Sequence, residues 1–114
     1  MTEAKRKRPT GLNAAGRALW DGNIDEFDWA VHEVALLEEA CRVRDRIVEL
    51  DAAVKGDGLM IPSSQGSRVH PAVAEARQQR LALARLLVSL GIPADDDGLP
   101  TVRGVRGVYR VGGR

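Results

Sequence analysis

Apolar residues recur at intervals of three and four along the chain, the spacing that places them on one side of an α-helix. The longest such stretch predicts a helix from about Glu26 to Val54, with Asp25 as its N-cap. Its apolar positions form two stripes, roughly 130° apart around the helix, so we expect two of its sides to be covered. The first stripe contains Leu36, Ala40, Val43, Ile47, Leu50 and Val54; the second contains Phe27, Ala30, Val34, Leu37, Cys41 and Val48.

Two further helices flank this long one. A short helix is predicted from about Asn13 to Asp21, ended by the sequence Asp-Gly-Asn because glycine and asparagine tolerate left-handed backbone. A third helix is predicted from Pro71, a favoured first helical residue, to about Leu90, before Gly91. The connector between the second and third helices reads equally well as a small β-hairpin or a loop, and its proline would have to lie on an edge strand.

These elements predict an all-α protomer in which a short N-terminal helix precedes an antiparallel hairpin of long helices, with a possible small β-hairpin as connector. We divide the chain into a basic flexible arm (1–11), a helical domain for oligomerisation and DNA recognition (12–92) and an Arg/Gly-rich tail (93–114). Trp20 and Trp29 are expected to pack the turn before the long helix, and Cys41 to lie in the core. So small a core favours stabilisation by oligomerisation.

Composition excludes several classes of protein. The 114 residues contain one cysteine, so no intrachain disulfide forms, and no apolar run is long enough to span a membrane. The two histidines have no nucleophile motif beside them, and we expect no catalytic residue, no cofactor and no metal site. The run Asp95–Asp97 reads as a solvated linker. An N-terminus without an apolar signal segment favours the cytoplasm.

The net charge of +1 conceals a segregation of charge along the chain. Residues 1–17 hold five cations and one carboxylate, a net +4, whereas residues 18–54 hold three cations and ten carboxylates, a net −7. Four consecutive cations can contact phosphates whatever the base sequence. A solubilising tail is the alternative interpretation of this arm. The cationic side chains predicted to bind DNA are Lys5, Arg6, Lys7, Arg8 and Arg17.

Several segments together resemble one protein family, the P27-type small subunit of phage terminase. They are Gly16–Trp20, Leu36–Cys41, Asp45–Ile47 and His70–Arg80, in an order and spacing that are similar to the family from about Gly11 to Ile92. The resemblance implies a non-enzymatic protein of the host cytoplasm that assembles into a ring and binds double-stranded viral DNA. It also implies a partner, the large terminase subunit, which holds the packaging ATPase and the nuclease.

The C-terminal end of such proteins often meets the large subunit, which implies a docking role for Arg103, Arg106, Tyr109 and Arg110. The single short helix before the long one argues against a full helix-turn-helix with a recognition helix. A different class of function stays open on the residues alone. The chain would then be a coiled-coil adaptor or assembly protein without nucleic-acid binding.

Overall fold

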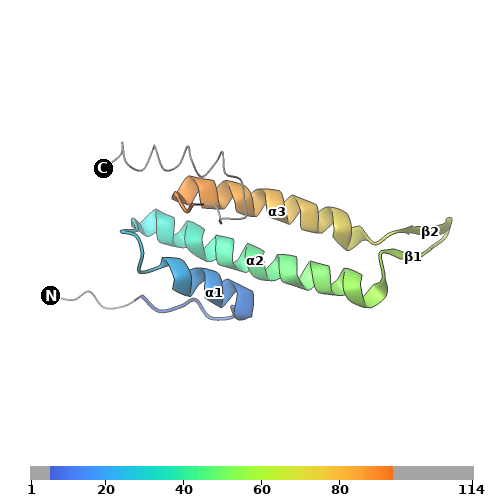
Figure 1. Ribbon diagram of the computed structural model, residues 1–114, viewed down its shortest axis with the longest axis horizontal. Coiled ribbons are helices and arrows are strands. Elements are labelled where there is room, and N and C mark those ends of the chain that lie inside the picture. Colours follow the sequence, from blue (N-terminus) through green and yellow to red (C-terminus); the bar gives the residue numbers. More distant parts are fainter. Residues whose placement is uncertain (1–5, 94–114) are drawn as a thin grey trace.

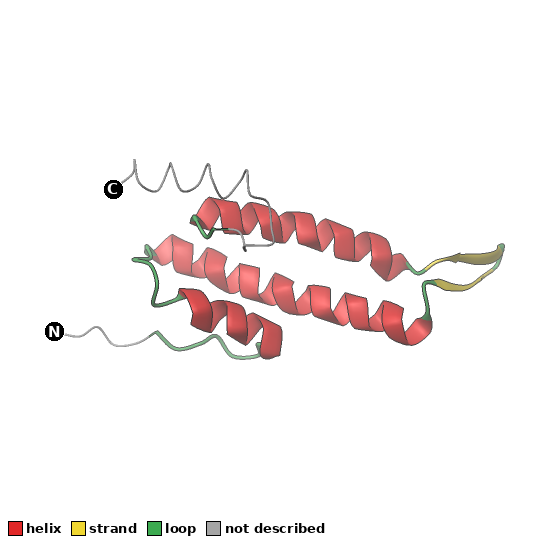
Figure 2. Cartoon of the chain, in the orientation of Figure 1, coloured by secondary structure: helices red, strands yellow, loops and turns green. Residues whose placement is uncertain are grey.

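The computed structural model describes residues 6–93. The elements are α1 (Ala14–Asn23), α2 (Val31–Asp57), β1 (Met60–Ser63), β2 (Gly66–Val69) and α3 (Pro71–Leu90). Figure 1 shows α2 in the middle, with α1 along part of one side and α3 along the other, while β1 and β2 project beyond one end. The mainly helical architecture with a small β-hairpin is confirmed, as the colours of Figure 2 make plain.

Each predicted stripe of α2 has a different helix packed against it, the second stripe over only part of its length. Every member of the first stripe is buried or half-buried, and Val43 and Leu50 lie beside Gln79 of α3. The second stripe packs against α1, where Leu37 and Cys41 are fully buried in a cluster with Trp20. The expectation that two sides of the long helix are covered is therefore confirmed, and α1 supplies the second cover.

The cover from α1 stops part-way along α2. The start of α1 lies against Asp45, and Val48, less than one turn further along the same stripe, is 43% exposed. The second stripe is therefore a core stripe only as far as α1 extends.

The start of α2 differs from the prediction. The helix begins at Val31 rather than Glu26, and the N-cap position is Ala30 rather than Asp25. The Glu33 carboxylate accepts a hydrogen bond from the Ala30 N–H at 2.8 Å and so satisfies one free amide. Phe27 and Ala30 consequently lie in the preceding loop and do not extend the helical stripe.

An aromatic contact explains why residues 24–30 leave the helix. The Trp29 indole donates from Nε1 to the carbonyl oxygens of Asn23 and Ile24, at 3.2 and 3.1 Å. Phe27 meets Trp29 edge-on, with ring centroids 5.2 Å apart. The loop folds around the indole, which confirms that the tryptophans pack this turn. The indole N–H uses the carbonyls at the end of α1 as its hydrogen-bond acceptors.

The first helix also runs further than predicted. The helix ends at Asn23 and passes through Gly22, so the prediction that Asp21-Gly22-Asn23 breaks it was wrong. Gly22 is not among the described glycines with positive φ, and the Asn23 side chain donates back to the Leu19 carbonyl at 2.9 Å.

The connector is the β-hairpin of the two sequence alternatives. Antiparallel pairing joins Met60 to Val69 and Pro62 to Ser67, so the proline lies on an edge strand as required. The third helix has the predicted bounds, with Pro71 first and Gly91 in the left-handed region at φ +79°. None of the helices in residues 6–93 is both long and apolar enough to cross a membrane.

Close approach of α1 to α2 depends on a glycine. A Cβ placed on Gly16 would lie 2.5 Å from Oδ2 of Asp45 and 2.7 Å from the Cys41 carbonyl oxygen. Gly22, on the same helix, has open space around it. Glycine at position 16 therefore serves packing rather than backbone flexibility.

The single cysteine lies at this same contact. Burial, then the negative charges of Asp45 and Glu38, raise the pKa of the Cys41 thiol from 9.0 to about 12. The thiol is fully buried and behaves as a small apolar core residue, as predicted from the sequence.

Gly16→Ala is expected to destabilise the protein by about 2 kcal/mol, because the added methyl forces α1 away from α2. The matched change Gly22→Ala, in the same helix, should instead stabilise by about 0.5–1 kcal/mol, since alanine is the better helix former. Urea unfolding followed by circular dichroism measures both. Equal effects of the two changes would contradict the close contact at Gly16.

The raised thiol pKa predicts a loss of stability in alkali. Between pH 9 and about 12 the unfolded chain releases the Cys41 proton while the folded chain keeps it. The free energy of unfolding should therefore fall by up to about 1.4 kcal/mol per pH unit in this window. Cys41→Ala removes this contribution, so urea unfolding should show a shallower pH dependence. Parallel pH profiles for the two proteins would refute the assignment.

Candidate nucleic-acid interface

The described part of the basic arm lies along α1 (Figure 1). The Arg8 guanidinium is 3.1 Å from the Asp21 carboxylate, and Arg42 of α2 donates to the Thr10 carbonyl at 3.2 Å. Leu12, just before the helix, is 5% exposed and belongs to the core cluster. The chain is thus attached to the helices from Arg8 onward, and the exposed Arg6 and Lys7 directly precede this attachment.

Three of the predicted DNA-binding cations keep their charge without a carboxylate partner in residues 6–93. Arg6 and Lys7 are exposed and form no ion pair there. Arg17 is also exposed, and its guanidinium donates to the neutral Leu12 carbonyl at 2.6 Å, which holds the side chain in place without cancelling its charge. Arg8 differs, because Asp21 neutralises it.

The remaining predicted site residues lie outside the described residues. Lys5 precedes the first of them. The residues proposed to dock on the large subunit, and the Asp95–Asp97 run, all follow Pro93; the docking residues are Arg103, Arg106, Tyr109 and Arg110.

The N-terminus of α1 is already occupied by a carboxylate. Asp45, 7% exposed, accepts from the backbone N–H groups of Asn13 and Gly16, both at 2.7 Å. A helix N-terminus is otherwise a good site for a phosphate. The amides of Asn13 and Gly16 are therefore not available to a phosphate, whereas the side chains of Arg6, Lys7 and Arg17 are exposed.

Asp45 was not singled out from the sequence, where it was one of ten carboxylates in the acidic segment. A signal was present: it lies four residues after Cys41 and continues the second apolar stripe towards the core. A carboxylate in an apolar stripe indicates a buried partner, because an unpaired buried charge is costly.

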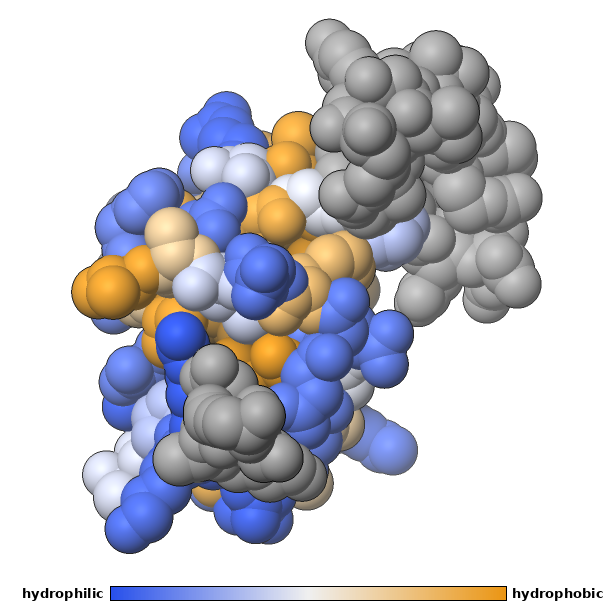
Figure 3. Space-filling model, turned by 90° about the vertical axis from the view of Figure 1, so that its left-hand side faces the viewer, coloured by the Kyte–Doolittle hydropathy of each residue, from blue (hydrophilic) through white to orange (hydrophobic). Residues whose placement is uncertain are grey.

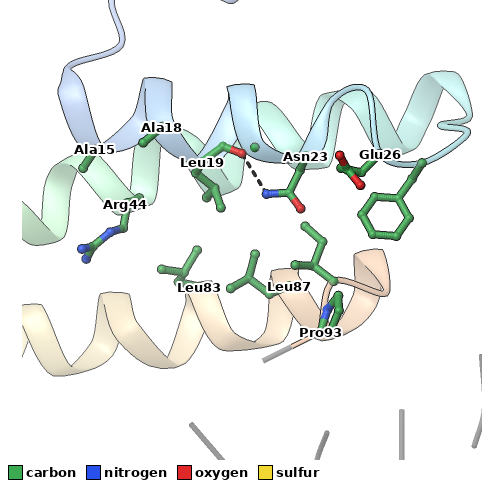
Figure 4. A pocket seen from close by; sticks show the side chains of 12 residues that line it. Ala15, Ala18, Leu19, Asn23, Glu26, Arg44, Leu83, Leu87 and Pro93 are labelled. Carbon is green, nitrogen blue, oxygen red and sulfur yellow. Dashed lines mark hydrogen bonds between the residues drawn. The ribbon is translucent and has the colours of Figure 1, made fainter. Parts of the chain in front are cut away.

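A groove with a volume of about 970 Å³ lies between α1 and α3, on the side of α1 away from the arm. Its apolar walls come from Ala15, Ala18 and Leu19 of α1 and from Leu83 and Leu87 of α3. Figure 4 shows these side chains facing one another across the space, with the Arg44 side chain at one end and Glu26 towards the other.

The groove holds no catalytic constellation. Its ionisable residues are Glu26 and Arg44, and no group of three histidine, cysteine or acidic side chains that could bind a metal occurs in residues 6–93. Its apolar walls suit an apolar protein segment rather than a nucleic acid.

No family model, no curated protein and no solved structure matches this chain.

Asp45→Ala is expected to destabilise the protein by about 3 kcal/mol, since two amides lose their charged acceptor. Glu49→Ala is the control on the same helix. It removes an exposed carboxylate 3.6 Å from Arg46 and should change stability by no more than about 0.5 kcal/mol. Urea unfolding compares the two. A destabilisation by Asp45→Ala as small as that of the control would show that the carboxylate does not hold α1.

Proposed function

We propose that this protein is a small terminase subunit that binds double-stranded viral DNA and presents it to the large terminase subunit for genome packaging. The observation that carries the proposal is the group of exposed cations Arg6, Lys7 and Arg17 on the arm side of α1, free of carboxylate partners within residues 6–93. Such side chains bind phosphates of any sequence. No catalytic role is proposed for any residue, because the ATPase and nuclease belong to the large subunit.

Assembly of the protomer into a ring is part of this proposal. One arm supplies few phosphate contacts and therefore weak, salt-sensitive binding. Several arms on one ring bind the same duplex together, and each later contact benefits from a high effective concentration. The small protomer core, built on three helices, also favours stabilisation by neighbouring copies.

The segments that resemble the P27-type family lie at packing contacts, which supports the proposal. Gly16 and Asp45 make the contact between α1 and α2. His70 caps α3, where its Nδ1 accepts from the Ala72 N–H at 3.0 Å. Residues at such contacts specify a fold, so the resemblance concerns the architecture and not a catalytic motif.

The arm is tested by Arg6→Ala combined with Lys7→Ala. Removing two phosphate-binding cations per protomer should weaken DNA retention about tenfold or more, and the slope of log affinity against log salt should fall by about 0.9 for each cation removed. Fluorescence anisotropy with a labelled duplex at several salt concentrations measures both quantities.

The matched control is Arg77→Ala combined with Arg85→Ala. It removes the same charge from exposed positions on α3 and should leave affinity within about twofold, apart from a small general charge effect. Equal retention by wild type and the arm variant would overturn the role of the arm. Absence of DNA binding by wild type would favour an adaptor protein without a nucleic-acid partner.

A further inference from the structure

The β-hairpin carries apolar side chains that the described chain covers only in part. Met60 and Val69 face each other across the two strands and are each 50% exposed, and Leu59 beside them is 58% exposed. Figure 1 shows the hairpin projecting past the ends of α2 and α3, away from the rest of the molecule. A two-stranded hairpin is marginally stable in water unless its apolar face packs on something, so this face requires a partner.

The groove between α1 and α3 is a concave apolar surface without an occupant among residues 6–93. Its α1 wall runs from Ala15 to Asn23, about 12 Å along a helix axis, and each hairpin strand of four residues is about 13 Å long. Hydrophobic surface is visible between hydrophilic side chains in Figure 3, which views the molecule from the end opposite the hairpin. A two-stranded hairpin therefore matches the groove in length and in chemistry.

The hairpin of one molecule cannot fill the groove of the same molecule. It leaves the end of α2 at Asp57, whereas the groove lies beside α1 and the last turns of α3. The 27 residues of α2, about 40 Å of rigid helix, span the two ends of the molecule. A hairpin seated in this groove must therefore come from a second copy of this chain.

The polar ends of the two surfaces are complementary. Arg44, at one end of the groove, forms no ion pair with any residue the structure describes and suits the polar hairpin turn at Ser64 and Gln65, whose carbonyls are acceptors. Arg68 of β2 is exposed on the face of the hairpin opposite Met60 and Val69, because neighbouring residues of a strand point to opposite faces, and it stays in solvent when the Met60 and Val69 face is buried.

We propose that the hairpin of one copy seats in the α1–α3 groove of the next, with Met60 and Val69 against the apolar walls and the turn at Ser64 and Gln65 towards Arg44. The contact joins different surfaces of the two copies, so each bound copy still offers one free hairpin and one free groove. Repetition of such a contact closes a ring or extends a filament. This interface rests on the proposed function only in that it specifies the contact by which the ring assembles.

The test uses single cysteines on the two surfaces of the full-length chain, Met60→Cys in one protein and Ala18→Cys in another. The natural Cys41 remains, because its buried thiol does not react in the folded protein. Mild oxidation of the mixture should give a cross-linked dimer of both variants in at least tenfold excess over that formed by either variant alone. Dimers formed by the Met60→Cys protein alone would overturn the proposal, since they indicate a symmetric contact between hairpins.

Native mass spectrometry supplies a second readout. Met60→Asp and Ala18→Arg should each shift the assembly towards the 12.4 kDa monomer. The control Leu81→Asp, an equally exposed apolar position on α3 outside the groove lining, should leave it intact. Disruption by Leu81→Asp alone would place the interface on the outer face of α3 and overturn the proposal.

The two proposals fail separately. Arm-dependent DNA binding without a mixed cross-link would overturn the hairpin–groove contact and leave the packaging function standing. A mixed cross-link in a protein that retains no DNA would support the contact and overturn the packaging function.

Discussion

The fold depends on one buried carboxylate that joins two helices. Asp45 accepts hydrogen bonds from the amides of Asn13 and Gly16 and so closes the start of α1 on the side of α2. The bare Cα of Gly16 lets the two backbones come close enough for this contact. A carboxylate that accepts amide hydrogen bonds can be buried, whereas an unpaired one cannot. The contact therefore needs both the carboxylate of Asp45 and the space left by Gly16.

The position of α1 decides what each side of the molecule presents. One flank receives the arm through Arg8 and Asp21, and the other forms a wall of the groove through Ala15, Ala18 and Leu19. A cationic surface and an apolar surface are thereby kept on opposite flanks of one short helix. The proposed contacts with DNA and with a neighbouring copy would therefore not compete for the same residues.

Periodicity predicted the helical parts of this fold well, because burial of an apolar stripe is a local property of the sequence. The stripes of α2 follow from it, whereas both ends of α3 follow from Pro71 and Gly91. The start of α2 could not be predicted from periodicity. Asp25 is a good N-cap in isolation, and only the tertiary contacts of Trp29 turn residues 24–30 into a loop. The role of Asp45 was not predicted for a similar reason, because it requires the amides at the start of α1, which are 29 and 32 residues away. The exposed state of Arg6, Lys7 and Arg17 agrees with their charge, whereas the pairing of Arg8 with Asp21 is not visible in the sequence.

One imidazole forms a three-way joint at the base of the hairpin. His70 directly follows the second strand, accepts from the Ala72 amide through Nδ1, and lies 2.9 Å from the Asp57 carboxylate through Nε2. Because Nδ1 must present a lone pair, the neutral ring carries its proton on Nε2 and donates it to Asp57. A single tautomer thus ties the end of α2, the hairpin and the start of α3 together. The hairpin is consequently joined at its base to both helices, and its direction in space is inherited from the two helices rather than from its own two strands.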